Sequence, residues 1–393
     1  MTMVDLSRRA FLGSVSLAWA APSAWAAAEP SARLVVIVLR GGMDGLHAIP
    51  PLGDPDYVPA RGGLALGPDS GAPALAGPFH LHPALAPLLP LWQSRELAIV
   101  HAVASPYRER SHFDGQDVLE SGGAKPHALS DGWLNRAVVE LGGVGAMAVR
   151  SSLPLLLRGS ARAASWDQSP LPGLPPERVR ALVALYAGDP LLAPAFEDGV
   201  QMEAFAAEAL AEDPMVMDGK PAKRSHAFPA LATAAGRLMA AAEGPRMVVM
   251  ELGGWDTHSG QMGRMVQPLA QLAEGITALA ASLGPVWRRT VVVCVSEFGR
   301  TVAENGTGGS DHGTGGAMIL AGGAVAGGRV IADWPGLAKE QRHQGRDLRP
   351  TLDGRAVFKG LLRDHFGLTA RALDGVVFPG SAGLRPLDSL IRA

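Results

Sequence analysis

The stretch RLVVIVLRGGMDGLH, residues 33–47, places an unbroken apolar run directly before an arginine, two glycines and the carboxylate of Asp44. An apolar run without polar alternation is typical of a strand buried on both faces, as in a parallel sheet covered by helices. Its polar end has two interpretations. Asp beside Gly is common in turns, whereas an acid at the edge of a sheet can also be a ligand or a catalytic group.

Four further apolar runs have the same character. They are ELAIVHAV (96–103), RMVVMEL (246–252), TVVVCVS (290–296) and GAMILAG (316–322). Ala/Leu-rich segments with helical spacing separate some of these runs, at 226–243 and 265–284. Strands that alternate with helices predict an α/β fold, here a three-layer αβα sandwich with a mainly parallel central sheet.

The composition limits the function classes. Of the 393 residues, 47% are hydrophobic, which is enough for a substantial core. The net charge is −2 and the lysines and arginines are scattered, so we expect no nucleic-acid partner. The single cysteine, Cys294, lies within an apolar run and cannot form an internal disulfide.

The amino terminus has the three parts of an export signal. Arg8 and Arg9 precede an uncharged Ala/Leu-rich stretch, which is followed by small residues suited to a signal peptidase. The arginine pair followed by Phe11 and Leu12 resembles a twin-arginine signal. A membrane anchor is the alternative, but the stretch is weakly apolar and contains Pro22. We expect residues 1–28 to be removed on export to the periplasm or beyond.

Residues 29–393 are expected to form one α/β domain. The stretch from about 150 to 225 contains Pro-punctuated short helical segments and no clear strand, so it is predicted to be a helical insertion outside the main sheet. No segment after the signal looks long and apolar enough to cross a membrane.

Polar side chains lie next to all five apolar runs. They are Asp44 after the first, Ser111 and His112 after the second, Asp256 and His258 after the third, Glu297 and Arg300 after the fourth, and Asp311 and His312 before the fifth. Ligands bind at the carboxyl ends of strands in open α/β sheets, because the loops meet there. Carboxylates with imidazoles suit Zn, Mn or Fe and, with fewer histidines, Mg or Ca.

Several of these groups also have an ordinary structural interpretation. Asp256 and His258 fit an Asx-type turn, and Asp311 with His312 fits a glycine-rich loop. Glu297 closes an apolar strand, where desolvation requires a partner. If Arg300 is that partner, the pair is structural. If it is not, Glu297 is a ligand and Arg300 faces an anionic substrate.

Ser111 precedes an expected helix of about ten residues, where a serine is normally an N-cap. The same position also suits a nucleophile, because a hydroxyl at a helix N-terminus beside a metal can attack phosphorus or sulfur. His112 is then a base or a ligand. The sequence contains no G-x-S-x-G elbow, no P-loop lysine motif and no H-E-x-x-H.

Five motifs together resemble one known family. They are LRGGMDGLHAIPPLGDPDY, RSHFDGQDVLESG, LGGWDTHSGQ, VVVCVSEFGRT and GGSDHGTGGAMILAGGAVAGGRV, in this order after the twin-arginine-like signal. The chain is similar to the DUF1501 family of exported bacterial proteins over nearly all of its mature length. This resemblance implies an alkaline phosphatase-like fold, as in sulfatases and metal-dependent phosphoglycerate mutases.

The resemblance also implies roles for individual residues. It makes Asp44 the first acid, Ser111 the nucleophile, and Asp256, His258 and His312 parts of a metal site, with an Asp-His spacing narrower than usual. Glu297 stands where the superfamily has the Asp of an Asp-His pair, but Phe298 follows it. Asp311 and His312 supply such a pair in sequence, so the alignment at this end stays ambiguous.

Two functions of different class are compatible with these residues. The first is a hydrolase of small phosphate or sulfate esters that uses a divalent ion (Zn, Mn, Mg or Ca) and a metal-activated nucleophile, with Arg40 or Arg300 stabilising the anion. The second is a non-catalytic exported protein that keeps the fold and assembles with an exported partner. A close cluster of the named side chains favours the enzyme.

Overall fold

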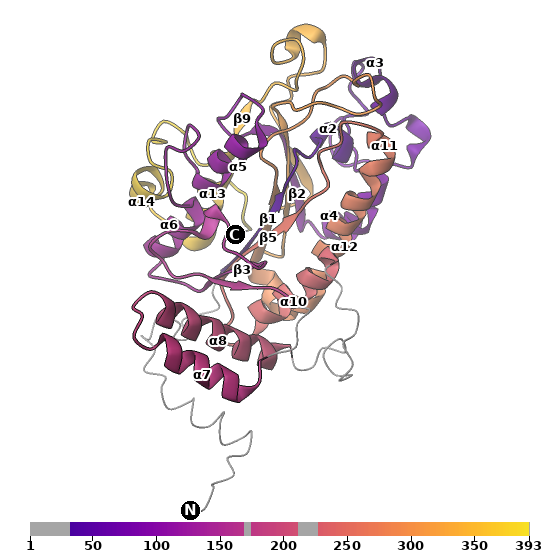
Figure 1. Cartoon of the computed structure of the whole chain (residues 1–393). Helices are drawn as coiled ribbons and strands as arrows, with labels where there is room; N and C mark the ends of the chain where they lie inside the picture. Colours follow the sequence, from indigo (N-terminus) through magenta and orange to yellow (C-terminus); the bar gives the residue numbers. More distant parts are fainter. Residues whose placement is uncertain (1–31, 169–173, 211–226, 393) are drawn as a thin grey trace, which may run out of the picture.

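A computed structural model describes residues 32–168, 174–210 and 227–392 (Figure 1). The predicted signal, residues 1–28, lies outside them. All five predicted strands form: β1 (Arg33–Leu39), β2 (Leu97–Ala104), β5 (Met247–Leu252), β6 (Thr290–Val295) and β7 (Gly316–Ala321). They belong to one nine-stranded sheet with the order β4-β3-β5-β1-β6-β7-β2-β8, in which β9 also pairs with β2.

The sheet is mainly parallel, as predicted. Strand β1 is parallel to both of its neighbours, β5 and β6. Among the described strands, only β7 runs antiparallel to its neighbours, β6 and β2. The remaining strands are short: β3 (Ala146–Val149), β4 (Ala164–Trp166), β8 (Arg329–Ile331) and β9 (Leu352–Asp353). The prediction that residues 150–225 contain no strand is wrong, because β4 lies in this range and pairs with β3.

Helices cover both faces of the sheet, which gives the predicted three layers (Figure 1). Alternate residues of β1 enter two separate cores, with Val35 in one and Val36 in the other. The first core includes residues of α10 (Phe228–Ala240) and α12 (Val266–Leu283), and the second includes α6 (Trp133–Glu140) and α13 (Gly354–Phe366). This two-sided burial is why β1 has no polar alternation.

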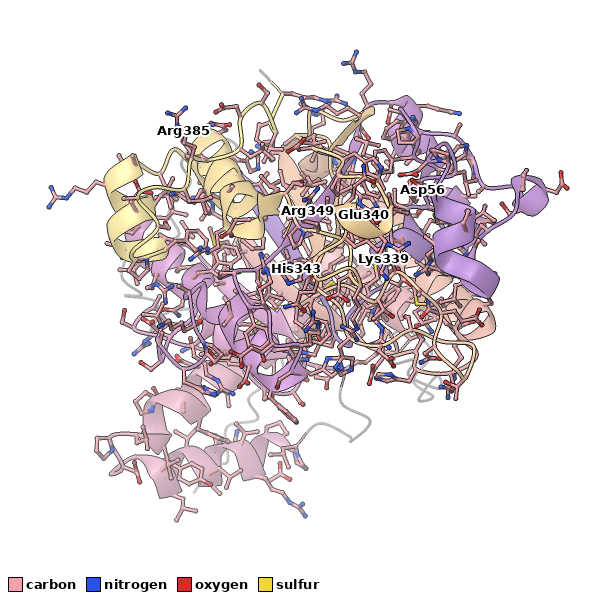
Figure 2. The ribbon with its side chains drawn as sticks, turned by 90° about the horizontal axis from the view of Figure 1, so that it is seen from above. Asp56, Lys339, Glu340, His343, Arg349 and Arg385 are labelled. Atoms are coloured by element: carbon pink, nitrogen blue, oxygen red, sulfur yellow. The ribbon has the colours of Figure 1, made fainter. Side chains whose placement is uncertain are left out.

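The other α-helices are shorter or peripheral. They are α2 (Gly45–Ala48), α3 (Tyr57–Arg61), α4 (Leu89–Gln93), α5 (His112–Ser121), α7 (Pro176–Tyr186), α8 (Leu192–Ala209), α11 (Gln261–Arg264) and α14 (Ala370–Ala372). Helices α7 and α8 account for much of the predicted helical insertion. They lie together at one end of the molecule, apart from most of the sandwich (Figures 1 and 2).

One described stretch, Gln261–Arg289, is long and apolar enough to cross a membrane by length and composition. The expectation that no such segment follows the signal is therefore wrong by this criterion. Within the stretch, α12 buries Leu269, Leu272 and Ile276 in the core and contacts α10. These contacts are those of a core helix of the sandwich.

The reversal of β7 determines where the loop at 296–315 begins and ends. Because β6 and β7 are antiparallel, the loop leaves the sheet and returns to it at the same edge. Its glycines permit close backbone contact: a Cβ on Gly313 would lie 2.4 Å from the carbonyl carbon of Arg300. Glu297 at the start of the loop and His312 near its end are thus brought to the carboxyl edge of β1 and β5.

Candidate functional site

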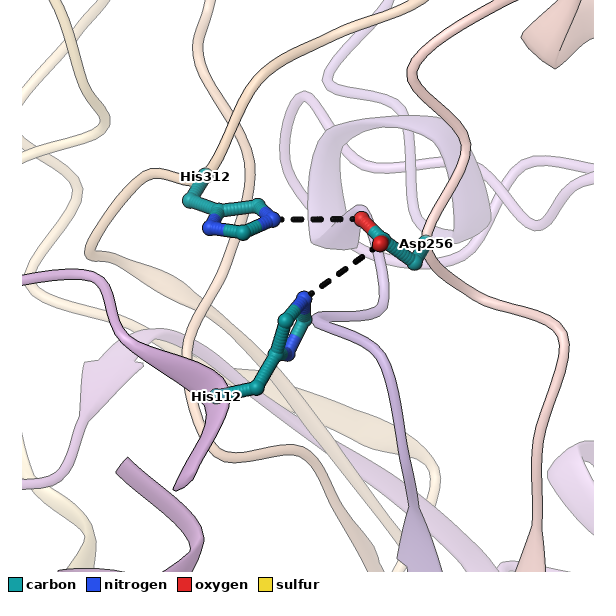
Figure 3. A group of neighbouring side chains, drawn as sticks. All are labelled: His112, Asp256 and His312. Carbon is teal, nitrogen blue, oxygen red and sulfur yellow. Dashed lines mark hydrogen bonds and ion pairs between the residues drawn. The ribbon is translucent and has the colours of Figure 1, made fainter. Parts of the chain in front are cut away.

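Three side chains from separate elements meet at this edge of the sheet (Figure 3). His112 is the first residue of α5, Asp256 follows β5, and His312 precedes β7. Each offers one ligand atom, and these atoms all lie within 4.8 Å of one another. The buried strands supply the rigid platform from which the three loops extend.

His258 lies at the same cluster. Its Nε2 is 3.0 Å from Oδ1 of Asp256 and 3.0 Å from Nε2 of His312. Nε2 of His312 is 3.2 Å from the same Asp256 oxygen, and Nε2 of His112 is 3.5 Å from Asp256 Oδ2. Three imidazole nitrogens thus face one carboxylate.

The other ring nitrogen of each histidine faces an acceptor. Nδ1 of His112 donates to Glu297 Oε1 at 2.7 Å, and Nδ1 of His258 donates to Asp311 Oδ1 at 3.0 Å. Nδ1 of His312 donates to the carbonyl oxygen of Arg110 at 2.8 Å. In the neutral ring the proton therefore stays on Nδ1, and the Nε2 lone pair points into the cluster.

Glu297 lies behind His112. The side chain is fully buried, and its Oε1 also accepts from the amide of Gly41 at 2.9 Å, while its Oε2 accepts from Ser296 Oγ at 2.9 Å. The hydrogen bond to Glu297 raises the pKa of His112. Burial raises the pKa of Glu297, but the bonds it accepts, first that from His112, bring the pKa below its usual value. Glu297 was predicted to be a ligand with Arg300 as the alternative partner; the structure gives it His112 instead.

Arg300 is buried and holds Asp256. Its Nη1 donates to Asp256 Oδ1 at 2.7 Å, and its Nε donates to Ser310 Oγ at 3.3 Å. Burial raises the pKa of Asp256, yet Arg300 outweighs this effect, so the pKa lies below its usual value. Arg300 therefore orients a member of the cluster, whereas it was expected either to face an anionic substrate or to pair with Glu297.

Asp311 likewise stands behind a histidine. Its Oδ1 accepts from Asn305 Nδ2 at 3.1 Å as well as from His258. These two hydrogen bonds, that from Asn305 first, lower the pKa of Asp311. The residue was predicted to be a metal ligand, and in the structure its carboxylate is a hydrogen-bond partner of His258.

Asp44 does not join the cluster. Its Oδ1 caps α2 by accepting from the amides of Leu46 and His47 at 3.0 and 3.1 Å. Its Oδ2 accepts from Arg61 Nη2 and from Gln261 Nε2, both at 2.6 Å. With these four bonds the carboxylate that was predicted to be a metal ligand is committed to a buried ion pair.

Ser111 is the N-cap of α5, and its Oγ accepts from the amide of Asp114 at 3.5 Å. This is the ordinary interpretation of the residue. Its role as a nucleophile stays a prediction.

Two residues that the sequence did not single out position His312. Arg110 has a positive φ of 65°, a strained conformation for a residue with a side chain, and this conformation aims its carbonyl at His312 Nδ1. Its guanidinium is held by the fully buried Asp347, at 2.9 and 2.8 Å from Oδ2. The pair is 237 positions apart, so no local pattern reveals it. Figure 2 shows the segment carrying His343 and Arg349, which flank Asp347 in sequence, on the upper side of the molecule.

If the cluster binds a metal, we expect Asp347→Asn to weaken the metal affinity by up to about tenfold, the lower end of the usual cost of losing an outer partner, because Asp347 acts on His312 only through Arg110. The Arg110 carbonyl would lose its charged anchor, and His312 would lose its fixed orientation. Titration with Zn²⁺ against a competing chelator measures the change, with Asp333→Asn on the surface as the control. Equal affinities in the two variants would contradict the positioning role.

Gly41 allows two of the site loops to touch. A Cβ on this residue would lie 2.8 Å from the amide nitrogen of Asp256, and its φ of 121° is unfavourable for other residues. The sequence RGGMD therefore contains a glycine where the loop after β1 approaches the loop that carries Asp256.

Arg40 follows β1 and is engaged by acidic neighbours. Its Nη2 contacts Glu120 at 2.6 Å and Glu251 at 2.5 Å, and its Nη1 donates to Gln116 at 2.7 Å. Arg40 also lines a cleft of about 370 Å³ that opens beside Asp256. Arg40 thus lies next to the cluster, and the carboxylates of Glu120 and Glu251 offset its charge.

Three solved structures are similar to this chain at low identity. The C-terminal periplasmic domain of EcEptC from Escherichia coli, in complex with Zn, has 10% identity and a TM-score of 0.32, covering 74% of this chain and 73% of that chain. Ps i-CgsB in complex with k-i-k-neocarrahexaose has 11% identity and a TM-score of 0.32, covering 76% and 68%. The phosphonate monoester hydrolase of Agrobacterium radiobacter has 11% identity and a TM-score of 0.36, covering 86% and 74%. These similarities are too weak to assign an activity.

No curated protein is significantly similar to the chain in sequence. The profile of one family, described as "Protein of unknown function (DUF1501)", matches residues 92–377. This range includes four of the five motifs that predicted the family, and three of those four carry the clustered side chains. The chain belongs to the DUF1501 family.

Proposed function

We propose that this protein is an exported, metal-dependent hydrolase of phosphate or sulfate esters. The observation that carries the proposal is the convergence of Nε2 of His112, His258 and His312 on the carboxylate of Asp256. Imidazole nitrogens with one carboxylate are donors typical of Zn²⁺, whereas Mg²⁺ and Ca²⁺ favour oxygen donors.

The geometry of these side chains fits a divalent cation. Nε2 of His112 is buried and has no hydrogen-bond partner in the described part of the chain. The Nε2 atoms of His258 and His312 are 3.0 Å apart although both protons are drawn to Nδ1, and two lone pairs at this distance repel unless a cation or a proton lies between them. The three Nε2 atoms lie 3.0–3.5 Å from an oxygen of Asp256. The ligand atoms of His112, Asp256 and His312 all lie within 4.8 Å of one another, which is close enough for them to share one ion.

Each proposed ligand is oriented by a partner behind it. Glu297 orients His112, Asp311 orients His258, the Arg110 carbonyl orients His312, and Arg300 orients Asp256. Such outer partners fix the ring orientation and keep the binding nitrogen unprotonated. The arrangement resembles a prepared metal site more than a set of surface ion pairs.

The charges of the chain favour an anionic substrate. The three imidazoles are neutral when they bind a metal, and Arg300 offsets the charge of Asp256. A divalent ion held by three of these four donors would keep a position open, as catalytic metal sites do. There it would act as a Lewis acid, polarising an ester oxygen and lowering the pKa of a water molecule. Around it, Arg300 and the outer partners hold the ligands in place while the ester approaches from the side of the cleft.

We expect Ser111→Ala to reduce stability by about 1 kcal/mol, the typical cost of losing an N-cap, and to leave most of the turnover. This follows because Ser111 Oγ caps α5 and the attacking group in our proposal is water. Thermal unfolding and steady-state kinetics measure the two effects. A loss of turnover of about 10³-fold or more with metal retained would restore Ser111 as the nucleophile.

The export route is part of the proposal and is supported by the arginine pair and apolar stretch at the amino terminus. Fusing residues 1–40 to a reporter that is transported only when folded tests this directly. The fusion with both arginines should place the reporter in the periplasm. Loss of this periplasmic reporter when Arg8 and Arg9 are replaced by lysine supports the twin-arginine route.

The hydrolase proposal is tested by metal analysis of the chain purified from the periplasm, followed by turnover of 4-nitrophenyl phosphate and 4-nitrophenyl sulfate with Zn²⁺, Mn²⁺, Mg²⁺ or Ca²⁺. We expect one tightly bound divalent ion and turnover that a chelator removes. If no metal binds and no ester is cleaved, the protein is better described as a non-catalytic exported protein that assembles with a partner.

A further inference from the structure

The cleft beside the cluster differs in charge from the cluster itself. It has a volume of about 370 Å³ and is lined by Arg40, Gly254, Asp256, Thr257, Arg264 and Pro268. This volume is at the lower end of the range for small-molecule sites. A ligand in the cleft would lie next to Asp256 and hence beside the proposed metal.

Most of the charges around the cleft are paired. Arg40 contacts Glu120 and Glu251, and Arg150 also contacts Glu251, so two cations face two carboxylates. Asp256, the carboxylate that lines the cleft, is bound by Arg300. These pairs leave the wall near neutral.

Arg264 is the exception. It ends α11 and is exposed, and its Nη1 donates to Ser259 Oγ at 3.3 Å. In the part of the chain that the structure describes, no carboxylate forms an ion pair with Arg264. The guanidinium therefore gives the cleft a positive charge that no carboxylate among the described residues offsets.

Gly254 and Pro268 form an apolar part of the cleft wall. Gly254 has a φ of 97°, and a Cβ there would lie 3.3 Å from Cγ of Pro268. Any side chain at position 254 would be strained and would narrow the cleft. The cleft thus combines a small apolar surface with one available cation.

We propose that this cleft binds the organic part of the ester, and that this part carries a carboxylate or another anionic group that is bound by Arg264. This inference rests on the proposed hydrolase function and names its substrate class: small esters with a second anionic group. A planar guanidinium binds a carboxylate or a sulfate through two parallel hydrogen bonds, which a neutral group cannot match.

The test compares two inert probes that differ by one carboxylate, phenylphosphonate and 4-carboxyphenylphosphonate. Isothermal titration calorimetry with the Zn²⁺-loaded full chain should show that the carboxylated probe binds about tenfold more tightly. The preference should fall to about one in Arg264→Gln and be partly kept in Arg264→Lys. Arg288→Gln, a change on the exposed surface, should leave the preference as it is. No preference in the unaltered protein, or a preference that survives Arg264→Gln, would overturn the proposal.

A failure of the hydrolase proposal gives a different result. If Zn²⁺ binds but neither phosphonate does, the ester chemistry is wrong, and titration with benzoate then examines the cleft alone. Benzoate binding that Arg264→Gln removes would support the anion site without the hydrolase. No benzoate binding would overturn the anion site as well.

Discussion

Asp256→Ala should abolish tight metal binding and lower ester turnover by about 10³-fold or more, because a metal contributes several kcal/mol to transition-state stabilisation. Asp256 is the carboxylate on which the three Nε2 atoms converge, at 3.0–3.5 Å. Without it, the Nε2 atoms of His258 and His312 lose the carboxylate that they share, although His258 Nδ1 keeps Asp311. Metal content measured by mass spectrometry and the rate of nitrophenyl ester cleavage follow the two effects.

The alanine variant also leaves Arg300 without its carboxylate, so loss of folding has to be separated from loss of metal. Asp256→Asn keeps the size and an acceptor for Arg300 while removing the charge, and it should fold and still bind metal poorly. Asp69→Ala on the surface is the matched control. If both Asp256 variants fold and keep their full metal content, the assignment of Asp256 as a metal ligand is refuted.

Asp44→Ala should lower the free energy of unfolding by about 3–5 kcal/mol, the usual effect of removing one partner of a buried ion pair. The side chains of Asp44 and Arg61 are 1% and 0% exposed, and the guanidinium would be left buried without its counter-charge. Denaturant-induced unfolding gives the value. The paired change Asp44→Leu with Arg61→Met should recover part of the loss, since it leaves no unpaired charge.

The same residue distinguishes our site from the one that the family resemblance implies. If Asp44 binds a metal, Asp44→Asn should reduce the metal content. In our structure Asp44 is occupied by Arg61, Gln261 and the first turn of α2, so the metal content of this variant should not change.

The fold could be predicted where the sequence signal was long. Strands β1, β2, β5, β6 and β7 are six to eight residues each and lack polar alternation, and all of them form. Strands β4 and β9 contain three and two residues, which is too short for any periodicity to show. They form because neighbouring strands supply their hydrogen bonds. Such pairing depends on other parts of the chain, so it does not show in the sequence of the short strand itself.

The site was predictable in its location and less so in its detail. Polar groups beside three of the apolar runs, His112, Asp256 and His312, do meet at one edge. The sequence could not show which polar groups face the centre of the cluster and which lie behind those groups as hydrogen-bond partners. Glu297 and His112 are 185 positions apart, and their hydrogen bond places the carboxylate behind the histidine. Similarly, the sequence does not reveal that Arg61 binds the carboxylate of Asp44.

The central place of β1 has a consequence for how the chain folds. Leu34 pairs with Met247 on one side and with Val291 on the other, more than 200 positions later in both cases. Contacts between such distant positions form slowly, because a long loop must close first. A growing chain therefore keeps its first strand unpaired until most of it has been synthesised. Assembly of the four clustered side chains, His112, Asp256, His258 and His312, should therefore be a late event in folding.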